Sequence, residues 1–223
     1  MSSLLEFPPA GIIFDLDGTL LDTEPLYSQA TQKLLDPYKH TYSLELKKRC
    51  MGGDSRRSAR LTIDEYDLPL TVDQYLADRE VYLLELFPSS PDIQGAGEFI
   101  TTLMEKRLTI GLATSSHKHL CDIKLSSKAW KSAFHSIVCG DNAAVKKGKP
   151  EPDIYLVCAA DLELPARDCI VFEDSPTGIK AARAAGMRVV AVNGPYVELE
   201  DLKDADIVID SYDEILPIVS RWQ

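Results

Sequence analysis

The segment Gly11–Tyr27, GIIFDLDGTLLDTEPLY, begins with a short apolar run and then places two aspartates one residue apart. The run GIIF predicts a β-strand that is covered on both faces, because buried strands read as continuous apolar stretches. Asp15 and Asp17 therefore fall at the end of a buried strand. Neighbouring carboxylates repel each other, and burying them is costly. The rest of the chain must supply the charge that compensates them.

Further short apolar runs of this kind recur along the chain. They are LTIGLA (108–113), SIVC (136–139), CIVF (169–172), RVVAV (188–192) and DIVI (206–209). The segments between them favour helices: GAGEFITTLMEKR is expected to place Phe99, Leu103 and Met104 on one face, and SPTGIKAARAAG ends at Gly186. Alternation of strands and helices predicts an α/β protein with a doubly wound parallel sheet.

The gap between the first and second strand runs is much longer than the crossover that joins parallel strands. It contains amphipathic helical patterns and no convincing strand. The patterns are EPLYSQATQKLLDPY, SLELKKRCMG, SRRSARLTIDEYDL and TVDQYLADREVYLLELF. We therefore expect a small helical domain at residues 24–87, inserted into an α/β core that comprises residues 1–23 and 88–223.

Composition narrows the class of protein. The net charge is -11 over 223 residues, which argues against nucleic acid and anionic membranes as partners, because both require a basic surface. No stretch resembles a signal peptide or a membrane span. The cysteines are odd in number and lack CxxC spacing, as is typical of reduced thiols in a cytoplasmic protein. We expect a cytoplasmic monomer whose partner is a small molecule.

Polar residues follow the predicted strands. Asp15 and Asp17 follow the first, Thr114 follows the second, the loop that carries Lys149 follows the third, and Glu173 with Asp174 follows the fourth. Ligands of open α/β sheets bind at the carboxyl ends of the strands. If these strands are neighbours, the groups meet at one edge of the sheet.

Convergence of Asp15, Asp17 and Asp174 predicts a Mg²⁺ site, because Mg²⁺ uses few protein carboxylates and keeps several waters. Lys149 and Thr114 would then face an anion such as a transferring phosphoryl group. Taken singly, these residues also fit helix caps, turn residues or a solvated lysine. Their order at the ends of successive strands favours a common site. No zinc, serine-hydrolase or P-loop pattern competes with this interpretation.

The same residues resemble the haloacid dehalogenase superfamily over nearly the whole chain. DLDGT (15–19) matches its first motif, Thr114 the second, Lys149 in GKPEPD the third, and EDSPTG (173–178) the fourth. The inserted helices resemble the small helical cap of that family. Flanking segments, including LATSSH and IKLSSKAWKSAFHSIVCGD, look like those of pseudouridine-5′-phosphatases and their glycerol-phosphatase-like relatives. The stretch GDNAAVKKGKP departs from that group, in which an Asp-Pro-Glu is expected after the Gly-Asp.

The resemblance implies a Mg²⁺-dependent phosphatase that hydrolyses a small phosphate monoester through an aspartyl-phosphate. It implies that Asp15 is the nucleophile and Asp17 the general acid and base. The metal is expected on the Asp15 carboxylate, the Asp17 backbone carbonyl and Asp174, with Glu173 acting through a water. Phosphate-binding residues are then Thr114, Ser115 and Lys149.

The substrate is less constrained than the chemistry. Specificity is expected from a cap loop that includes Met51, Gly52, Arg56 and Arg57, since a glycine permits close approach and arginine offers paired donors. Pseudouridine 5′-phosphate is one candidate substrate, and glycerol or sugar phosphates are alternatives. A β-phosphoglucomutase would be expected to carry a histidine near Tyr27, and residues 15–35 contain none.

Two further alternatives are weaker. A halide-releasing enzyme has no leaving oxygen to protonate and would not need Asp17. A catalytically idle scaffold that binds a phosphoprotein or a phosphometabolite would not need the four motifs intact.

Overall fold

The computed structural model describes residues 5–50 and 55–222. The chain divides into two compact units, one formed by Met1–Asp22 with Pro91–Gln223 and the other by Thr23–Ser90. The sequence suggested boundaries at 23/24 and 87/88. No helix in the described ranges is long and apolar enough to cross a membrane.

The larger unit is built on a parallel sheet with the strand order β3-β2-β1-β4-β5-β6. The strands are β1 (Gly11–Phe14), β2 (Thr109–Thr114), β3 (Ser136–Cys139), β4 (Cys169–Glu173), β5 (Arg188–Val192) and β6 (Ile207–Ile209). The helices of this unit are α5 (Ala96–Glu105), α6 (Lys118–Lys124), α7 (Asp153–Asp161), α8 (Pro176–Ala184) and α9 (Leu216–Val219). The prediction of a doubly wound parallel sheet is confirmed.

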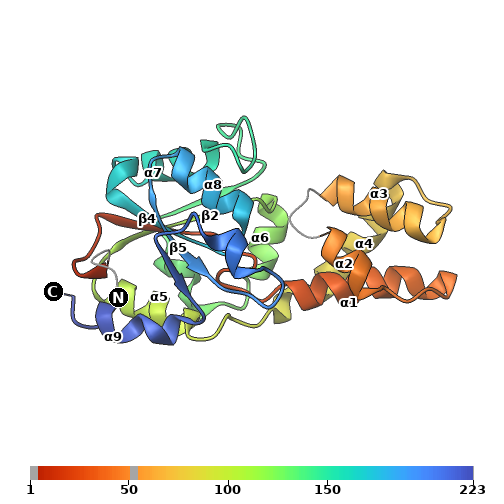
Figure 1. The fold of residues 1–223 in the computed structure, drawn as a ribbon, viewed down its shortest axis with the longest axis horizontal. Coiled ribbons are helices and arrows are strands. Elements are labelled where there is room, and N and C mark those ends of the chain that lie inside the picture. The colour runs from red at the N-terminus through yellow and green to blue at the C-terminus, as the bar shows by residue number, and fades with distance from the viewer. Residues whose placement is uncertain (1–4, 51–54, 223) are drawn as a thin grey trace. The chain divides into compact units, whose positions relative to one another are not determined.

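Side-chain alternation along the strands divides the core into two layers. Ile12 and Phe14 of β1 pack with α5 and α9 in one hydrophobic cluster, whereas Ile13 packs with α7 and α8 in the other. The two pairs of helices accordingly cover opposite faces of the sheet (Figure 1). One sequence expectation is wrong: Met104 is exposed, and Ile100 takes its place on the buried face of α5 beside Phe99.

In its described residues, the regular secondary structure of the smaller unit is helical. Its helices are α1 (Glu24–Leu35), α2 (Leu44–Cys50), α3 (Ser55–Tyr66) and α4 (Val72–Leu86). They enclose a small core that includes Leu35, Ala59 and Tyr75. At the start of α4, Thr71 and Gln74 form a reciprocal capping box, which satisfies backbone donors at the helix N-terminus.

Short 3-10 segments complete the secondary structure. They are η2 (Asp36–Tyr38), η3 (Phe87–Ser89), η4 (Ala129–Ala133), η5 (Ala166–Asp168), η6 (Leu199–Leu202) and η7 (Tyr212–Glu214). All five cysteines are buried and unpaired by disulfides, as the sequence indicated.

Candidate active site

Asp15 lies at the carboxyl end of β1, in the middle of the sheet. Its backbone N–H donates to the carbonyl of Phe172 in β4 at 3.0 Å, so the pairing of the two strands continues up to the site. Below it, the rings of Phe14 and Phe172 stack with centroids 4.9 Å apart. The Asp15 carboxylate is therefore held on a rigid, desolvated base.

The loop after Asp15 turns sharply at Gly18, which has φ of 85°. A Cβ at Gly18 would lie 2.1 Å from Oδ2 of Asp174, so only glycine permits this approach. Thr19 follows, and its Oγ1 donates to Asp174 Oδ1 at 3.0 Å. The Thr19 carbonyl in turn accepts from the hydroxyl of Tyr212 at 3.1 Å. The turn therefore fixes Asp174 beside the first-motif loop.

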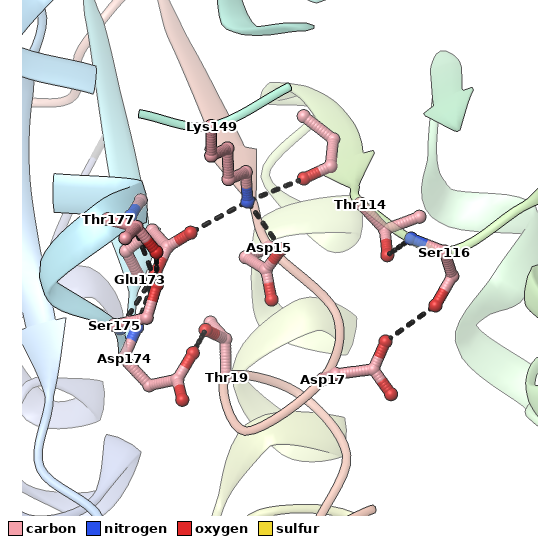
Figure 2. Close-up of polar contacts among 12 residues, drawn as sticks. Asp15, Asp17, Thr19, Thr114, Ser116, Lys149, Glu173, Asp174, Ser175 and Thr177 are labelled. Atoms are coloured by element: carbon pink, nitrogen blue, oxygen red, sulfur yellow. Dashed lines mark hydrogen bonds and ion pairs between the residues drawn. The ribbon is translucent and has the colours of Figure 1, made fainter. Parts of the chain in front are cut away.

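Lys149 is the cation nearest to the Asp15 carboxylate. Its Nζ donates to Asp15 Oδ1 at 2.6 Å and to Glu173 Oε1 at 2.7 Å, and Figure 2 shows the ammonium between the two carboxylates. Burial alone would lower the pKa of Lys149, but Asp15 and Glu173 outweigh it and raise that pKa well above its usual range. Lys149 is thus a fixed positive charge in the site.

Glu173, the last residue of β4, is almost completely enclosed by donors. Its Oε1 accepts from Lys149 and from the Tyr155 hydroxyl at 2.9 Å. Its Oε2 accepts from the backbone N–H of Asp174 and Ser175 and from the Ser175 hydroxyl. Burial would raise the pKa of Glu173, but Lys149 and these hydrogen bonds lower it below its ordinary value. Both oxygens of Glu173 are therefore engaged, one with Lys149 and the other with the start of α8. The contact of Glu173 with a metal-bound water stays a prediction.

The pKa values of Asp15 and Asp174 are shifted upward, in the opposite direction to that of Glu173. Burial, opposed in part by Lys149, raises the pKa of Asp15 to about 7. Burial and then the charges of Glu173 and Asp15 raise the pKa of Asp174 well above its usual range. Two desolvated carboxylates that repel each other are short of positive charge, which a hard divalent cation would supply.

The residues present fit Mg²⁺, although no cluster of three or more His, Cys, Asp or Glu side chains that could hold a metal occurs within 5–50 and 55–222. The predicted set needs only two carboxylates, Asp15 and Asp174, with the backbone carbonyl of Asp17 as a third ligand. Mg²⁺ commonly binds through one or two carboxylates and keeps water in its remaining positions.

Asp17 points away from Lys149 and toward α6. Its Oδ2 accepts from the hydroxyl of Ser116 at 2.9 Å, and its Oδ1 accepts from Nζ of Lys124 at 2.6 Å. The side chain of Asp17 is 25% exposed, whereas Lys124 is fully buried. The two aspartates of the first motif thus have different partners, which is the condition for two different chemical roles.

The end of β2 provides the hydroxyl groups of the site. Thr114 is buried, and its Oγ1 accepts from the backbone N–H of Ser116 at 3.1 Å (Figure 2). Ser115 is exposed. Thr114 and Ser115 stay candidates for phosphate binding, but the contact with Asp17 comes from Ser116, which was not among the predicted site residues.

The predicted specificity residues lie in the helical unit. Arg56 forms an exposed ion pair with Asp73 at 2.6 Å, and Arg57 donates to the Arg49 carbonyl at 3.1 Å. Met51 and Gly52 lie outside the described residues. The role of these four positions in specificity stays a prediction.

The helical unit also contains a buried arginine that the sequence analysis missed. Arg79 lies over the rings of Tyr27 and Tyr75, and its Nε has no hydrogen-bond partner within the described part of the chain. Its position in α4 places it between buried Tyr75 and Leu83 at helical spacing, which is the signal that could have revealed it.

Lys124 and Tyr155 were missed for a similar reason. Each lies on a helix, where a lone lysine or tyrosine gives no motif. Lys124 follows buried Cys121 by three residues and therefore shares its face of α6. The sequence indicates the contact between Lys124 and Asp17 only through the presence of a lysine at an apolar position of a short helix.

Together, the fold and the site define an α/β protein with a buried carboxylate–lysine centre at the carboxyl edge of its sheet. The model of the haloacid dehalogenase-like hydrolases matches residues 12–192. The chain belongs to this family.

Several curated proteins are similar to the chain over most of their length. It is 37% identical over 209 residues to a probable pseudouridine-5′-phosphatase of Drosophila melanogaster, covering 92% of this chain and 90% of the relative. It is 35% identical over 212 residues to (DL)-glycerol-3-phosphatase 2 of Arabidopsis thaliana, covering 92% and 88%. Among solved structures, a β-phosphoglucomutase of Clostridium difficile matches with a TM-score of 0.74 and 22% identity, covering 95% and 97%. This last likeness shows the fold alone.

Proposed function

We propose that this protein is a Mg²⁺-dependent phosphatase that hydrolyses a small-molecule phosphate monoester through an aspartyl-phosphate on Asp15. Membership of the hydrolase family and the similarity to named phosphatases support the reaction class of a phosphoric monoester hydrolase. The observation that carries the proposal is the contact of 2.6 Å between Lys149 and the buried carboxylate of Asp15. This ammonium can neutralise a phosphoryl oxygen while Asp15 attacks phosphorus.

In the first step, a carboxylate oxygen of Asp15 forms a bond to phosphorus as the ester P–O bond breaks. Asp17 donates a proton to the departing alkoxide. In the second step, water attacks the phosphorus of the aspartyl-phosphate as the P–O bond to Asp15 breaks, and Asp17 accepts a proton from the water. The products are an alcohol, inorganic phosphate and free Asp15.

The remaining polar groups orient the phosphate. Lys149 offers its charge, and Thr114 and Ser115 are the candidate hydroxyl donors at the end of β2. Asp15, Asp174 and the carbonyl of Asp17 would hold Mg²⁺, which supplies positive charge against the phosphate oxygens. We further propose that the protein acts as a cytoplasmic monomer.

The substrate is proposed as a small polar ester, with pseudouridine 5′-phosphate tested first. The similarity to relatives named for pseudouridine and glycerol phosphates supports this choice. The comparison should be kcat/KM across pseudouridine 5′-phosphate, glycerol phosphate, sugar phosphates and p-nitrophenyl phosphate, since specificity is differential transition-state binding. If none exceeds p-nitrophenyl phosphate, a broad phosphatase becomes the better description.

The reaction itself is tested by phosphate release from the wild type and from Asp15→Asn. The amide is a poor nucleophile, so Asp15→Asn is expected to lose essentially all turnover. An exposed aspartate, Asp201, provides a matched control as Asp201→Asn, which is expected to retain full activity. Near-normal turnover by Asp15→Asn would show that the nucleophile is wrongly assigned.

A β-phosphoglucomutase-like phosphomutase is the second candidate, and the solved structure of that name supports only a common fold. The two reactions are separated by product analysis. A mutase returns a phosphate ester, whereas a phosphatase releases inorganic phosphate.

A further inference from the structure

Lys124, Ser116 and Asp17 form a closed triangle of hydrogen bonds beside the proposed nucleophile. Nζ of Lys124 donates to Asp17 Oδ1 at 2.6 Å and to Ser116 Oγ at 2.9 Å. Ser116 Oγ donates to Asp17 Oδ2 at 2.9 Å. Both oxygens of Asp17 are thus held by groups from the β2–α6 region.

Lys124 stands at a position that packing would assign to an apolar residue. It is fully buried, and its helical neighbours Cys121 and Leu125 are buried with it. Burying an ammonium costs several kcal/mol, and its ion pair seldom repays more than an apolar side chain would. A contribution to stability therefore does not explain why a lysine occupies this position, whereas the contact of its ammonium with Asp17 does.

The two oxygens of Asp17 have unlike partners. Oδ1 meets a buried ammonium, which can only donate. Oδ2 meets the hydroxyl of Ser116, which can donate or accept and can rotate. A proton on Asp17 is therefore compatible with Oδ2 and not with Oδ1.

We propose that Lys124 is a positioning residue for Asp17, which holds Oδ1 so that Oδ2 is the oxygen that exchanges a proton with the leaving group and with water. This inference rests on the proposed phosphatase reaction. When the ester bond breaks, the proton on Oδ2 passes to the departing oxygen, while Oδ1 keeps its bond to Lys124. When water attacks, Oδ2 accepts the proton again. Ser116 follows these changes by rotating its hydroxyl.

The test compares two substrates whose leaving groups differ in how strongly they require protonation by a general acid. The best alkyl ester of the panel has a strongly basic leaving oxygen, whereas p-nitrophenolate leaves without a proton. Lys124→Met, which keeps the length of the chain without its donor, is expected to lower kcat/KM for the alkyl ester by about tenfold to a hundredfold. The kcat/KM for p-nitrophenyl phosphate should change little, because kcat/KM reports the step in which the leaving group departs and not the later hydrolysis of the aspartyl-phosphate, which is common to both substrates.

Lys124→Gln retains an N–H donor without a charge and is expected to recover part of the lost alkyl-ester turnover. In an Asp17→Asn background, Lys124→Met should add no further loss, because both changes remove the same function. Lys128→Met is the matched control. Lys128 is a mostly buried lysine paired with Asp92 at 2.6 Å, and its loss is expected to leave the ratio of the two activities unchanged.

An equal loss on both substrates by folded Lys124→Met would overturn the proposal, and so would full additivity with Asp17→Asn. If Lys124→Met does not fold, Lys124→Gln and Ser116→Ala decide by the same substrate ratio. Failure of the wild type to release phosphate from any ester would instead overturn the proposed function.

Discussion

The hydroxyl of Tyr155 donates to Glu173 Oε1 at 2.9 Å, the same oxygen that accepts from Lys149. Nζ of Lys149 also lies 4.9 Å from the centre of the Tyr155 ring. Tyr155 is completely buried in α7. It therefore supports the lysine of the site in two ways, through the carboxylate that Lys149 binds and through the face of its ring.

Tyr155→Phe separates these two contributions, because it removes the hydroxyl and keeps the ring. We expect a loss of about 1.5–3 kcal/mol in the free energy of unfolding, the usual value of a hydrogen bond to a charged group. At about 2–4 °C per kcal/mol for a chain of this size, the melting temperature should fall by about 3–12 °C. Tyr38→Phe is the control, since the hydroxyl of Tyr38 makes no hydrogen bond among the described residues and its removal should leave the melting temperature unchanged. An unchanged melting temperature in Tyr155→Phe would contradict this account.

Gly18→Ala tests the turn that brings Asp174 to the first-motif loop. The added Cβ would stand 2.1 Å from Asp174 Oδ2, at a backbone φ of 85° that alanine avoids. The carboxylate must move, so the apparent Mg²⁺ affinity and kcat are both expected to fall. Gly194→Ala, where nothing lies within 4 Å of a Cβ, should retain both values. Equal Mg²⁺ activation curves for the wild type and Gly18→Ala would refute this role of the turn.

Lys149→Ala and Lys146→Ala are expected to differ sharply, although both residues belong to one basic loop. Lys149 contacts two buried carboxylates, whereas the Lys146 ammonium donates to the Ala143 carbonyl on the surface. Removing Lys149 leaves Asp15 and Glu173 without their cation, at a cost of about 3–5 kcal/mol. Turnover should be lost and the melting temperature should fall. Similar losses in both variants would indicate that the loop acts only as a diffuse positive field.

Metal removal is expected to stop turnover. EDTA should abolish phosphate release and added Mg²⁺ should restore it, while EDTA already saturated with Mg²⁺ is the control. Excess Ca²⁺ should inhibit, because Ca²⁺ takes more oxygen ligands and would draw both oxygens of Asp15 into coordination. Full turnover in metal-free buffer would exclude the proposed metal-dependent chemistry.

The sheet and the positions of most polar groups were accessible from the sequence because they depend on regular patterns. Continuous apolar runs predicted every strand within one or two residues, as for β2, which runs from Thr109 to Thr114 instead of 108–113. The last residue of a strand in a parallel sheet, and the residue after it, must lie at the carboxyl edge of the sheet. Asp15, Thr114 and Asp174 could therefore be placed from the sequence.

Side chains that reach the site from helices were not accessible in the same way. Lys124 and Tyr155 are single residues on α6 and α7, and nothing local distinguishes them from solvated or core residues. The hydrogen bond between Ser116 and Asp17 was not accessible either, because the direction of the Ser116 side chain depends on the turn after β2. Register and periodicity predict which face a residue occupies, but the identity of its partner depends on packing between distant elements.

The hydrogen bond from Tyr212 to the Thr19 carbonyl has a consequence for the order in which the protein is made. A ribosome releases the loop that contains Asp15 early and η7, to which Tyr212 belongs, only near the end of translation. The contacts of Tyr212 with the rings of Phe99 and Phe172 also cannot form until Tyr212 has been synthesised. A nascent chain stalled before Tyr212 thus carries every reacting group of the site and still lacks the clamp on the first-motif loop.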